Sequence, residues 1–331
     1  MNETELLVYS RTEHGHRKDY IEFVGRIVPS RRANLSRIVF SKNPVLFLMI
    51  EENFLNYFLV SIFRSAIGRA TSGLLFRPLE AANGKSIRLK LKRALLKLLK
   101  KYRLVRTITI VPFYLAKEIS SVADNWIYDF QLWDLYDDKK QEMMTIEPDQ
   151  KLTSELHKIS EKRKLICALG SQNREKGFDS FIENSTHGPD NNIFYFFGGR
   201  VQPELKGLVE KLNSNEGGGF DRIISNNELY SLYSSADAIW CFYAKEYNQA
   251  SGILGRAIQL GKTVIVRNNS LSHKLCQAED IKHIALSDEL EVIHYEDLTR
   301  GHSSASRIEL IKMFREKSVK VMRESITNPY S

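Results

Sequence analysis

Short apolar runs that alternate with helical segments constrain the fold of this chain more than any other feature. In the C-terminal half, five runs with the length of strands are separated by segments with helical spacing. They are residues 165–169, 193–197, 222–224, 238–243 and 263–266. Strands that alternate with helices indicate a parallel, doubly wound sheet. The chain is therefore expected to be an α/β protein.

The N-terminal half shows a weaker form of the same alternation. It opens with an apolar run at 5–10, a polar loop and a helix from about Lys18, and further runs stand at 45–50 and 107–112. A chain of 331 residues exceeds what one core usually organises. Two Rossmann-like domains are expected. Their predicted bounds are 1–135 for the first, 136–160 for a polar linker, 161–304 for the second and 305–331 for a terminal helix that could pack on either domain.

The cysteines and the N-terminus indicate a cytoplasmic protein. Cys167, Cys241 and Cys276 lack the spacing of metal ligands, and two of them lie in apolar runs, so buried and reduced thiols are expected. The first residues lack the basic region and apolar stretch of a secretory signal. The longest apolar stretch, 45–63, is interrupted by acids and amides and is too polar in its middle for a membrane span.

The net charge of +8 is concentrated in one segment, because residues 85–106 hold ten Lys or Arg and no acid. Apolar residues recur there at helical spacing, which predicts a basic amphipathic helix. Its stripe consists of Leu91, Ala94, Leu95, Leu98 and Leu99. Such a helix can bind an anionic membrane surface, pack its leucines on a sheet as an ordinary domain helix, or contact nucleic acid phosphates. Because no aromatics interleave with the charges, a nucleic acid partner is not expected.

Three loops that follow predicted strands carry the residue types that bind phosphate. Residues 170–177 begin and end with glycine and contain Arg174 and Lys176, while Gly199 belongs to a glycine pair after the next strand. A third loop leads into a helix that starts at Ser251-Gly252, whose free backbone N–H groups attract anions. Parallel strands place all three loops at one edge of the sheet. Together they favour a ligand that contains phosphate.

The order of these motifs resembles the donor half of family-4-type (group 1) GT-B glycosyltransferases. The matching segments are LICALGSQNREKG at 165–177, FGGRV at 197–201, NELYSLYSSAD at 227–237 and SGILGRAIQLGKTVI at 251–265. The resemblance implies two Rossmann-like domains with the active site in the interdomain cleft. It also implies transfer of a sugar from a nucleotide-diphosphate sugar to a saccharide or lipid-linked acceptor, of the kind used in bacterial surface polysaccharide synthesis.

The resemblance also suggests which residues bind the donor. It places Arg174 and Lys176 at the diphosphate, with Gly170, Gly199, Ser251 and Gly252 allowing close approach of the backbone. The first loop, SRTEHGHR at 10–17, is more loosely similar to the family's first loop and places Gly15 near the donor phosphates. His16 and Glu13 in that loop are the candidate catalytic residues, because a histidine beside a glycine can orient or deprotonate the acceptor. The same two side chains could instead contact only solvent.

One departure from the family concerns the donor ribose. The family carries two acids eight residues apart, and here Asn248 and Arg256 take those places. Glu246 lies two residues out of register and is the candidate substitute. We expect metal-independent transfer with retention at the anomeric carbon, no cofactor, and a peripheral position on the inner face of the membrane through residues 85–106.

Two other functions fit the same pattern. A sugar-nucleotide epimerase of this fold would act without an acceptor, and a non-catalytic subunit would bind the sugar nucleotide without turnover. The absence of the acid pair leaves both alternatives open, and measurement of turnover with and without acceptors separates them.

Overall fold

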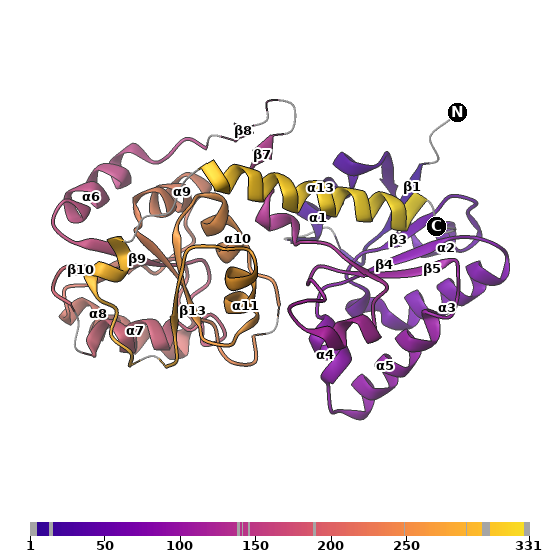
Figure 1. Cartoon of the computed structure of the whole chain (residues 1–331), viewed down its shortest axis with the longest axis horizontal. Coiled ribbons are helices and arrows are strands. Elements are labelled where there is room, and N and C mark those ends of the chain that lie inside the picture. The colour runs from indigo at the N-terminus through magenta and orange to yellow at the C-terminus, as the bar shows by residue number, and fades with distance from the viewer. Residues whose placement is uncertain are drawn as a thin grey trace. The chain divides into compact units, whose positions relative to one another are not determined.

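The computed structural model describes residues 5–12, 16–137, 140, 142–144, 146–187, 190–247, 249–288, 290–299 and 305–327. The chain forms two compact units (Figure 1). Unit 1 comprises residues 1–130, 248–250 and 313–331, and unit 2 comprises residues 131–247 and 251–312. The terminal helix α13 (Ala305–Thr327) contributes residues to both units.

Unit 1 is built on a six-stranded parallel sheet in the order β2-β1-β3-β4-β5-β6. Its strands are β1 (Leu6–Tyr9), β2 (Ser30–Arg32), β3 (Val45–Phe47), β4 (Thr71–Leu75), β5 (Val105–Thr109) and β6 (Asn125–Trp126). Its helices are α1 (His16–Ile27), α2 (Leu35–Phe40), α3 (Phe54–Ala66), α4 (Pro78–Asn83) and α5 (Ile87–Leu99), with short 3-10 turns at Ile50–Asn53 and Lys117–Ser121. The core lies between this sheet and the helices, around residues such as Phe47, Tyr57 and Leu96.

Unit 2 contains a second six-stranded parallel sheet, in the order β11-β10-β9-β12-β13-β14. Its strands are β9 (Lys164–Leu169), β10 (Ile193–Gly198), β11 (Gly218–Phe220), β12 (Ala238–Cys241), β13 (Thr263–Arg267) and β14 (His283–Leu286). Its helices are α6 (Gln150–Ser160), α7 (Phe178–Thr186), α8 (Lys206–Ser214), α9 (Asn226–Ser235), α10 (Gly252–Gln259), α11 (Leu271–Ala278) and α12 (Tyr295–Thr299). Successive strands extend in both directions from β9, which is the arrangement of a dinucleotide-binding sheet.

The predicted α/β fold with two Rossmann-like domains is confirmed. The polar segment 136–160 contains a two-stranded antiparallel hairpin, β7 (Tyr136–Asp137) and β8 (Glu142–Met143), and helix α6, which packs against α9. The three cysteines are buried in unit 2, on β9, β12 and α11. No helix in the described ranges is long and apolar enough to cross a membrane.

Strands β2, β4, β6 and β14 were not predicted, and β11 lies outside its predicted range. Glycines account for the differences at β11 and β4. The prediction of a strand at 222–224 is wrong. The observed strand, β11, covers Gly218–Phe220, and the glycines of this segment are more typical of a loop. The ring of Phe197 on the neighbouring strand occupies the space that a side chain at Gly219 would need. In unit 1, β4 was not predicted, and Tyr57 covers Gly73 in the same way. An aromatic ring from elsewhere therefore supplies the packing that the strand's own sequence lacks.

Helices α6, α9, α10 and α11 begin after an Asp or Ser residue at the N-cap position. Ser225 caps α9 and forms a reciprocal capping box with Glu228. Helix α10 ends at Gln259 with Leu260 as its C-cap residue, and Gly261 follows with a left-handed backbone.

Candidate functional site

The loops after β9 and β10 meet at the carboxyl end of the unit 2 sheet. Gly170 and Gly199 have positive φ angles of 83° and 143°. The Gly170 carbonyl occupies the place where a side chain at position 199 would begin, so only glycine fits there. The Gly170 N–H donates to the carbonyl of Gly198 at 2.9 Å. The two predicted glycine loops are thus in direct backbone contact, beside the point where strand order reverses between β9 and β12.

Gln172 holds the first of these loops in place. Its side chain is buried, and its amide nitrogen donates to the carbonyl oxygens of Ala168 at 3.1 Å and Gly170 at 2.9 Å. Its backbone forms an isolated parallel bridge with Val201 in the second loop. Gln172 was not among the predicted site residues, although a glutamine two residues after a strand that ends at a glycine is a usable sequence signal.

Lys176 lies in a cage of hydroxyl and aromatic groups. Its Nζ donates to Tyr247 Oη at 2.6 Å and to Ser251 Oγ at 3.1 Å, and it lies over the rings of Tyr243 and Tyr247 at 4.6 and 4.5 Å from their centroids. No carboxylate of the described residues lies within ion-pair distance of it. Burial lowers the pKa of Lys176 to about 8. A nearby anion would favour the protonated ammonium.

The start of α10 contributes further donors to the same place. Ser251 holds the N-cap position, but its hydroxyl makes no cap hydrogen bond and instead contacts Tyr243 Oη at 2.7 Å and Lys176. The first backbone N–H groups of a helix have no partner within the helix. Because the cap side chain is directed to Lys176, these donors and the ammonium lie at one place, which suits an anionic ligand.

Gly252 has a packing role that the sequence analysis did not anticipate. A side chain there would begin 2.8 Å from Oε1 of Gln131. A larger side chain at position 252 would therefore displace Gln131 as well as hinder the approach of a phosphate group.

Three predicted donor-binding residues do not join the Lys176 cage. Arg174 is exposed and pairs with Asp179 at 3.0 Å, and Glu246 is also exposed. Arg256 lies on α10 and pairs with the largely buried Asp134 at 3.0 Å, and Asp134 also accepts from Gln259. The guanidinium that replaces the family's acid thus holds the start of the hairpin segment against α10.

The remaining predicted residues belong to the first loop and to the loop before α10. Glu13, Gly15 and Asn248 lie outside the described residues. His16 begins α1, and its side chain is likewise outside the description. Nearby in unit 1, Arg17 pairs with Glu52, which follows β3. Within the described ranges, no group of three or more His, Cys, Asp or Glu residues could hold a metal ion.

Known structures provide an independent comparison of the fold. The glycosyltransferase WaaG, involved in lipopolysaccharide biosynthesis, matches with a TM-score of 0.52 and 15% identity, over 98% of this chain and 100% of its own. HepE (Alr3699) of Anabaena, solved with UDP and glucose, matches with a TM-score of 0.57 and 10% identity, over 99% and 96%. The α,α-trehalose 6-phosphate synthase of Burkholderia multivorans matches with a TM-score of 0.53 and 10% identity, over 87% and 71%.

No family model and no curated protein sequence matches the chain. At these identities the structural likeness concerns the fold. It agrees with the sequence resemblance, and together with the two parallel six-stranded sheets it shows that this chain has the GT-B fold.

Proposed function

We propose that this chain is a glycosyltransferase that uses a nucleotide-diphosphate sugar bound at the carboxyl edge of the unit 2 sheet. The observation that carries the proposal is the Lys176 cage beside the glycine loops and the start of α10. Known structures of the same fold support a sugar nucleotide as the ligand, because HepE has been solved with UDP-glucose. UDP is therefore the first nucleotide to test.

The proposed reaction moves the sugar to a hydroxyl group of the acceptor. The bond between the anomeric carbon and the β-phosphate oxygen breaks, and a bond from the acceptor oxygen to that carbon forms. The acceptor hydroxyl proton passes to the departing β-phosphate oxygen and from there to solvent. The leaving diphosphate gains negative charge in this step. Lys176, with a pKa of about 8, is largely protonated at neutral pH and, with the N–H groups of α10, would stabilise that charge.

The proposal also concerns the acceptor and the outcome at the anomeric carbon. We infer a saccharide or lipid-linked saccharide of bacterial surface polysaccharide synthesis, and the role of WaaG in lipopolysaccharide biosynthesis supports this choice. The resemblance favours retention without a metal ion, with Glu13 and His16 facing the acceptor. A contact with an anionic membrane surface through residues 85–106 would bring the chain to a lipid-linked acceptor.

Nucleotide binding by wild-type protein and by Lys176→Met tests the proposal. A ligand at 100 times its dissociation constant stabilises the folded state by about 2.7 kcal/mol, so UDP should raise the unfolding temperature. Because a hydrogen bond to a charged group contributes about 1.5–3 kcal/mol, Lys176→Met should weaken UDP binding by about 10- to 100-fold. Lys211→Met, an exposed lysine on α8, is the matched control and should bind as wild type.

Calorimetry with UDP, GDP and ADP measures these affinities directly. Binding of none of them by wild-type protein, or equal binding by wild type and Lys176→Met, would contradict the donor site. Epimerised or hydrolysed sugar nucleotide without an acceptor would favour an epimerase, and binding without turnover over any acceptor would favour a non-catalytic subunit.

A further inference from the structure

Helix α3 has an apolar outward face. Its exposed side chains recur every four residues and continue just past its end. They are Leu55, 63% exposed, Leu59, Phe63 and Ile67. Phe40, at the end of α2, is 70% exposed and contacts the Phe63 ring with centroids 5.7 Å apart. A surface helix of a globular protein normally carries polar residues on this side.

The cation of α3 points in the opposite direction, into unit 1. Arg64 is fully buried, and its five hydrogen bonds go to the carbonyls of residues 38, 41, 43 and 70 and to the Thr71 hydroxyl. Helix α3 therefore has its charge inside and its leucines outside. This polarity is the reverse of the usual one.

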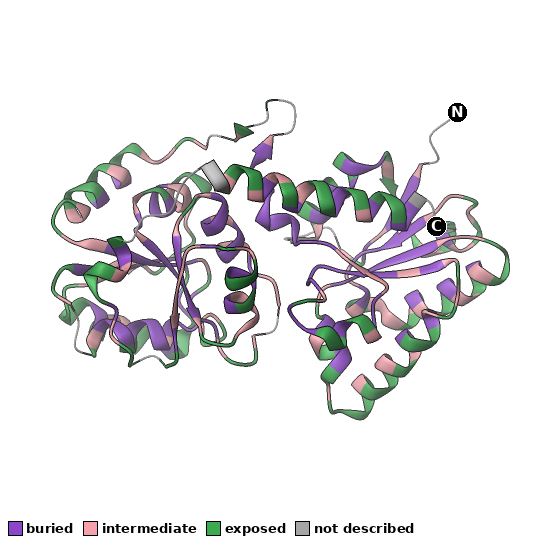
Figure 2. Cartoon of the chain, in the orientation of Figure 1, coloured by how far each residue is buried: buried purple, intermediate pink, exposed green. Residues whose placement is uncertain are grey.

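Helix α5 lies beside α3 and repeats the pattern (Figure 1). The sequence predicted one stripe of leucines, which in an ordinary domain helix would pack on the sheet. Instead Leu96 and Leu99 are buried, while Ile87, Leu91 and Leu98 are 85%, 59% and 37% exposed. Figure 2 shows exposed residues along both helices. In the described part of the chain, eight of the fifteen exposed large apolar side chains belong to α2, α3, α5 and the residue that follows α3.

Exposed cations flank the apolar residues of α5. Arg88, Lys90, Lys97 and Lys101 are exposed, and no hydrogen bond or ion pair links their side chains to another described residue. Residues 53–117 contain a single acid, Glu80. We name this surface the apolar–basic face. It consists of Phe40, Leu55, Leu59, Phe63, Ile67, Ile87, Leu91 and Leu98 with the four cations.

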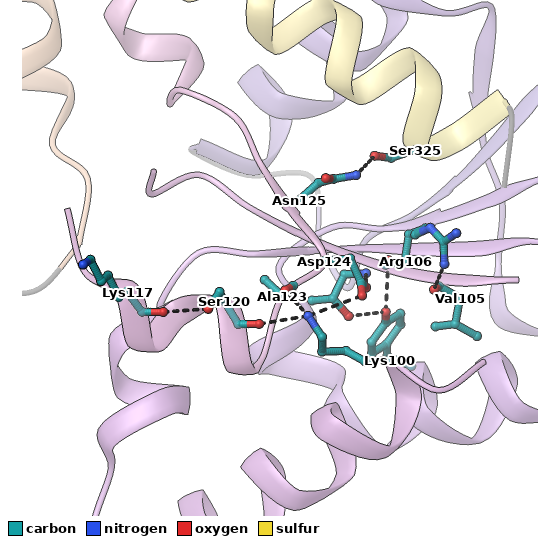
Figure 3. A network of polar contacts seen from close by, with 11 residues as sticks. Lys100, Val105, Arg106, Lys117, Ser120, Ala123, Asp124, Asn125 and Ser325 are labelled. Carbon is teal, nitrogen blue, oxygen red and sulfur yellow. Dashed lines mark hydrogen bonds and ion pairs between the residues drawn. The ribbon is translucent and has the colours of Figure 1, made fainter. Parts of the chain in front are cut away.

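Other basic residues of α5 and its C-terminal end do not belong to this face. Lys100 turns inward, where Nζ donates to the carbonyls of Ser120 and Ala123 and pairs with Asp124 at 3.6 Å (Figure 3). Lys92 lies over the Phe54 ring at 5.5 Å from its centroid, and Arg93 donates to the Ala82 carbonyl. A substitution of Lys100 would therefore disturb the fold as well as the surface charge.

We propose that the apolar–basic face docks on an anionic lipid bilayer, with the apolar side chains of α3 and α5 inserted among the lipids and the flanking cations at the headgroups. The charge pattern selects this partner, because cations beside an apolar stripe match anionic headgroups over a hydrocarbon layer. A second copy of the chain would bring the cations of two α5 helices together. The inference extends the membrane contact of the proposed function from residues 85–106 to α3.

Vesicle co-sedimentation tests the docking face, and it needs neither donor nor acceptor. The full chain is mixed with phosphatidylcholine vesicles that contain or lack phosphatidylglycerol, at low and high salt. The apolar variant is Leu59→Gln/Ile87→Gln/Leu91→Gln, and the cation variant is Arg88→Gln/Lys90→Gln/Lys97→Gln/Lys101→Gln. Their matched controls in unit 2 are Ile223→Gln, at an 80% exposed site, and Lys151→Gln/Lys158→Gln/Lys211→Gln/Lys274→Gln.

Wild type and both controls should sediment with anionic vesicles, and part of the binding should persist at high salt because inserted side chains are not screened. Each of the two face variants should lower the partition coefficient by at least about tenfold. Circular dichroism and unfolding temperatures verify that all variants fold.

Three outcomes would overturn the proposal. They are failure of wild type to bind anionic vesicles at low salt, unchanged binding by the apolar variant, and a lipid-free dimer that the apolar variant abolishes while vesicles bind neither protein. Failure here leaves the transferase proposal intact, because UDP binding depends on Lys176. Loss of UDP binding in Lys176→Met likewise leaves sedimentation unchanged.

Discussion

Each unit encloses one cation, Arg64 in unit 1 and Lys176 in unit 2, and the two differ in the groups that surround them. In unit 1, the buried guanidinium of Arg64 donates all five of its hydrogen bonds to oxygen atoms of the protein. In unit 2, the half-buried ammonium of Lys176 meets two hydroxyls and two aromatic rings. The first cation is saturated by its own chain. The second retains an attraction for an anion that no carboxylate of the described residues satisfies.

The difference shows how to separate a structural charge from one that serves a ligand. Burial lowers the pKa of both groups, to about 10 for Arg64 and to about 8 for Lys176. The direction of the shift therefore does not distinguish them, and the set of acceptors around each cation does. Three predictions test this distinction, in order of decreasing effect.

Removal of the saturated cation should have the largest effect, on stability. Arg64→Met leaves several buried carbonyl oxygens without donors, so unit 1 should lose on the order of 3 kcal/mol of free energy of unfolding. Arg64→Lys should recover part of the loss, because one ammonium has three donors rather than five. Urea unfolding measures both. If Arg64→Met unfolds at the wild-type urea concentration, the hydrogen bonds of Arg64 do not stabilise the unit.

Lys176, the unsaturated cation, should instead make both UDP affinity and stability depend on pH. A bound diphosphate favours protonated Lys176, so UDP affinity should fall as pH rises above about 8, by up to about tenfold per pH unit. The phosphate groups of UDP are already ionised there. Without ligand the sign reverses: because the folded chain loses this proton before the unfolded chain does, wild-type stability should rise between pH 8 and the usual lysine pKa. Calorimetry and urea unfolding in a pH series measure these two effects.

Lys176→Met is the control for both effects. It should show neither the fall in UDP affinity nor the rise in stability. If Lys176→Met shows the same pH profile as wild type, the titrating group is not Lys176. The contrast between Lys176 and Arg64 would then no longer hold.

The smallest effect should come from the exposed cation of the same loop. Arg174 is already paired with Asp179 at the surface, and exposed pairs contribute about 0–1 kcal/mol. Arg174→Gln should therefore weaken UDP binding by less than about fivefold, far less than Lys176→Met. Titration calorimetry ranks the two. An equal loss in both variants would show that Arg174 leaves Asp179 for the diphosphate, and that enclosure is not what distinguishes a ligand-binding cation.

The sequence predicted the parts of the site that depend on local pattern. The glycine at the end of β9, the glycine pair after β10 and the Ser251-Gly252 helix start were all readable, because strand ends and helix starts have short-range signals. Only part of the Lys176 cage could be predicted from the sequence. Tyr243 and Tyr247 follow β12, and nothing near them in the sequence indicates that Lys176, seventy residues earlier, lies over their rings.

Long-range packing explains the other differences. A strand such as β11 has weak local propensity and forms because Phe197 covers Gly219. The orientation of α5 depends on the neighbouring helix and sheet, which bury Leu96 and Leu99 rather than the full predicted stripe. The packing of Gly252 under Gln131 was equally invisible, because the two residues are distant in sequence.

Because the three thiols are buried in unit 2, their reactivity reports on the opening of that unit. Burial raises the pKa of Cys241 to about 12 and shifts those of Cys167 and Cys276 in the same direction, so native unit 2 offers almost no thiolate to an alkylating reagent. Unit 1 contains no cysteine. The alkylation rate in native buffer therefore counts the openings of unit 2 alone. A nucleotide bound at Lys176 should slow this alkylation in proportion to its occupancy. The measurement does not require that an acceptor has been identified.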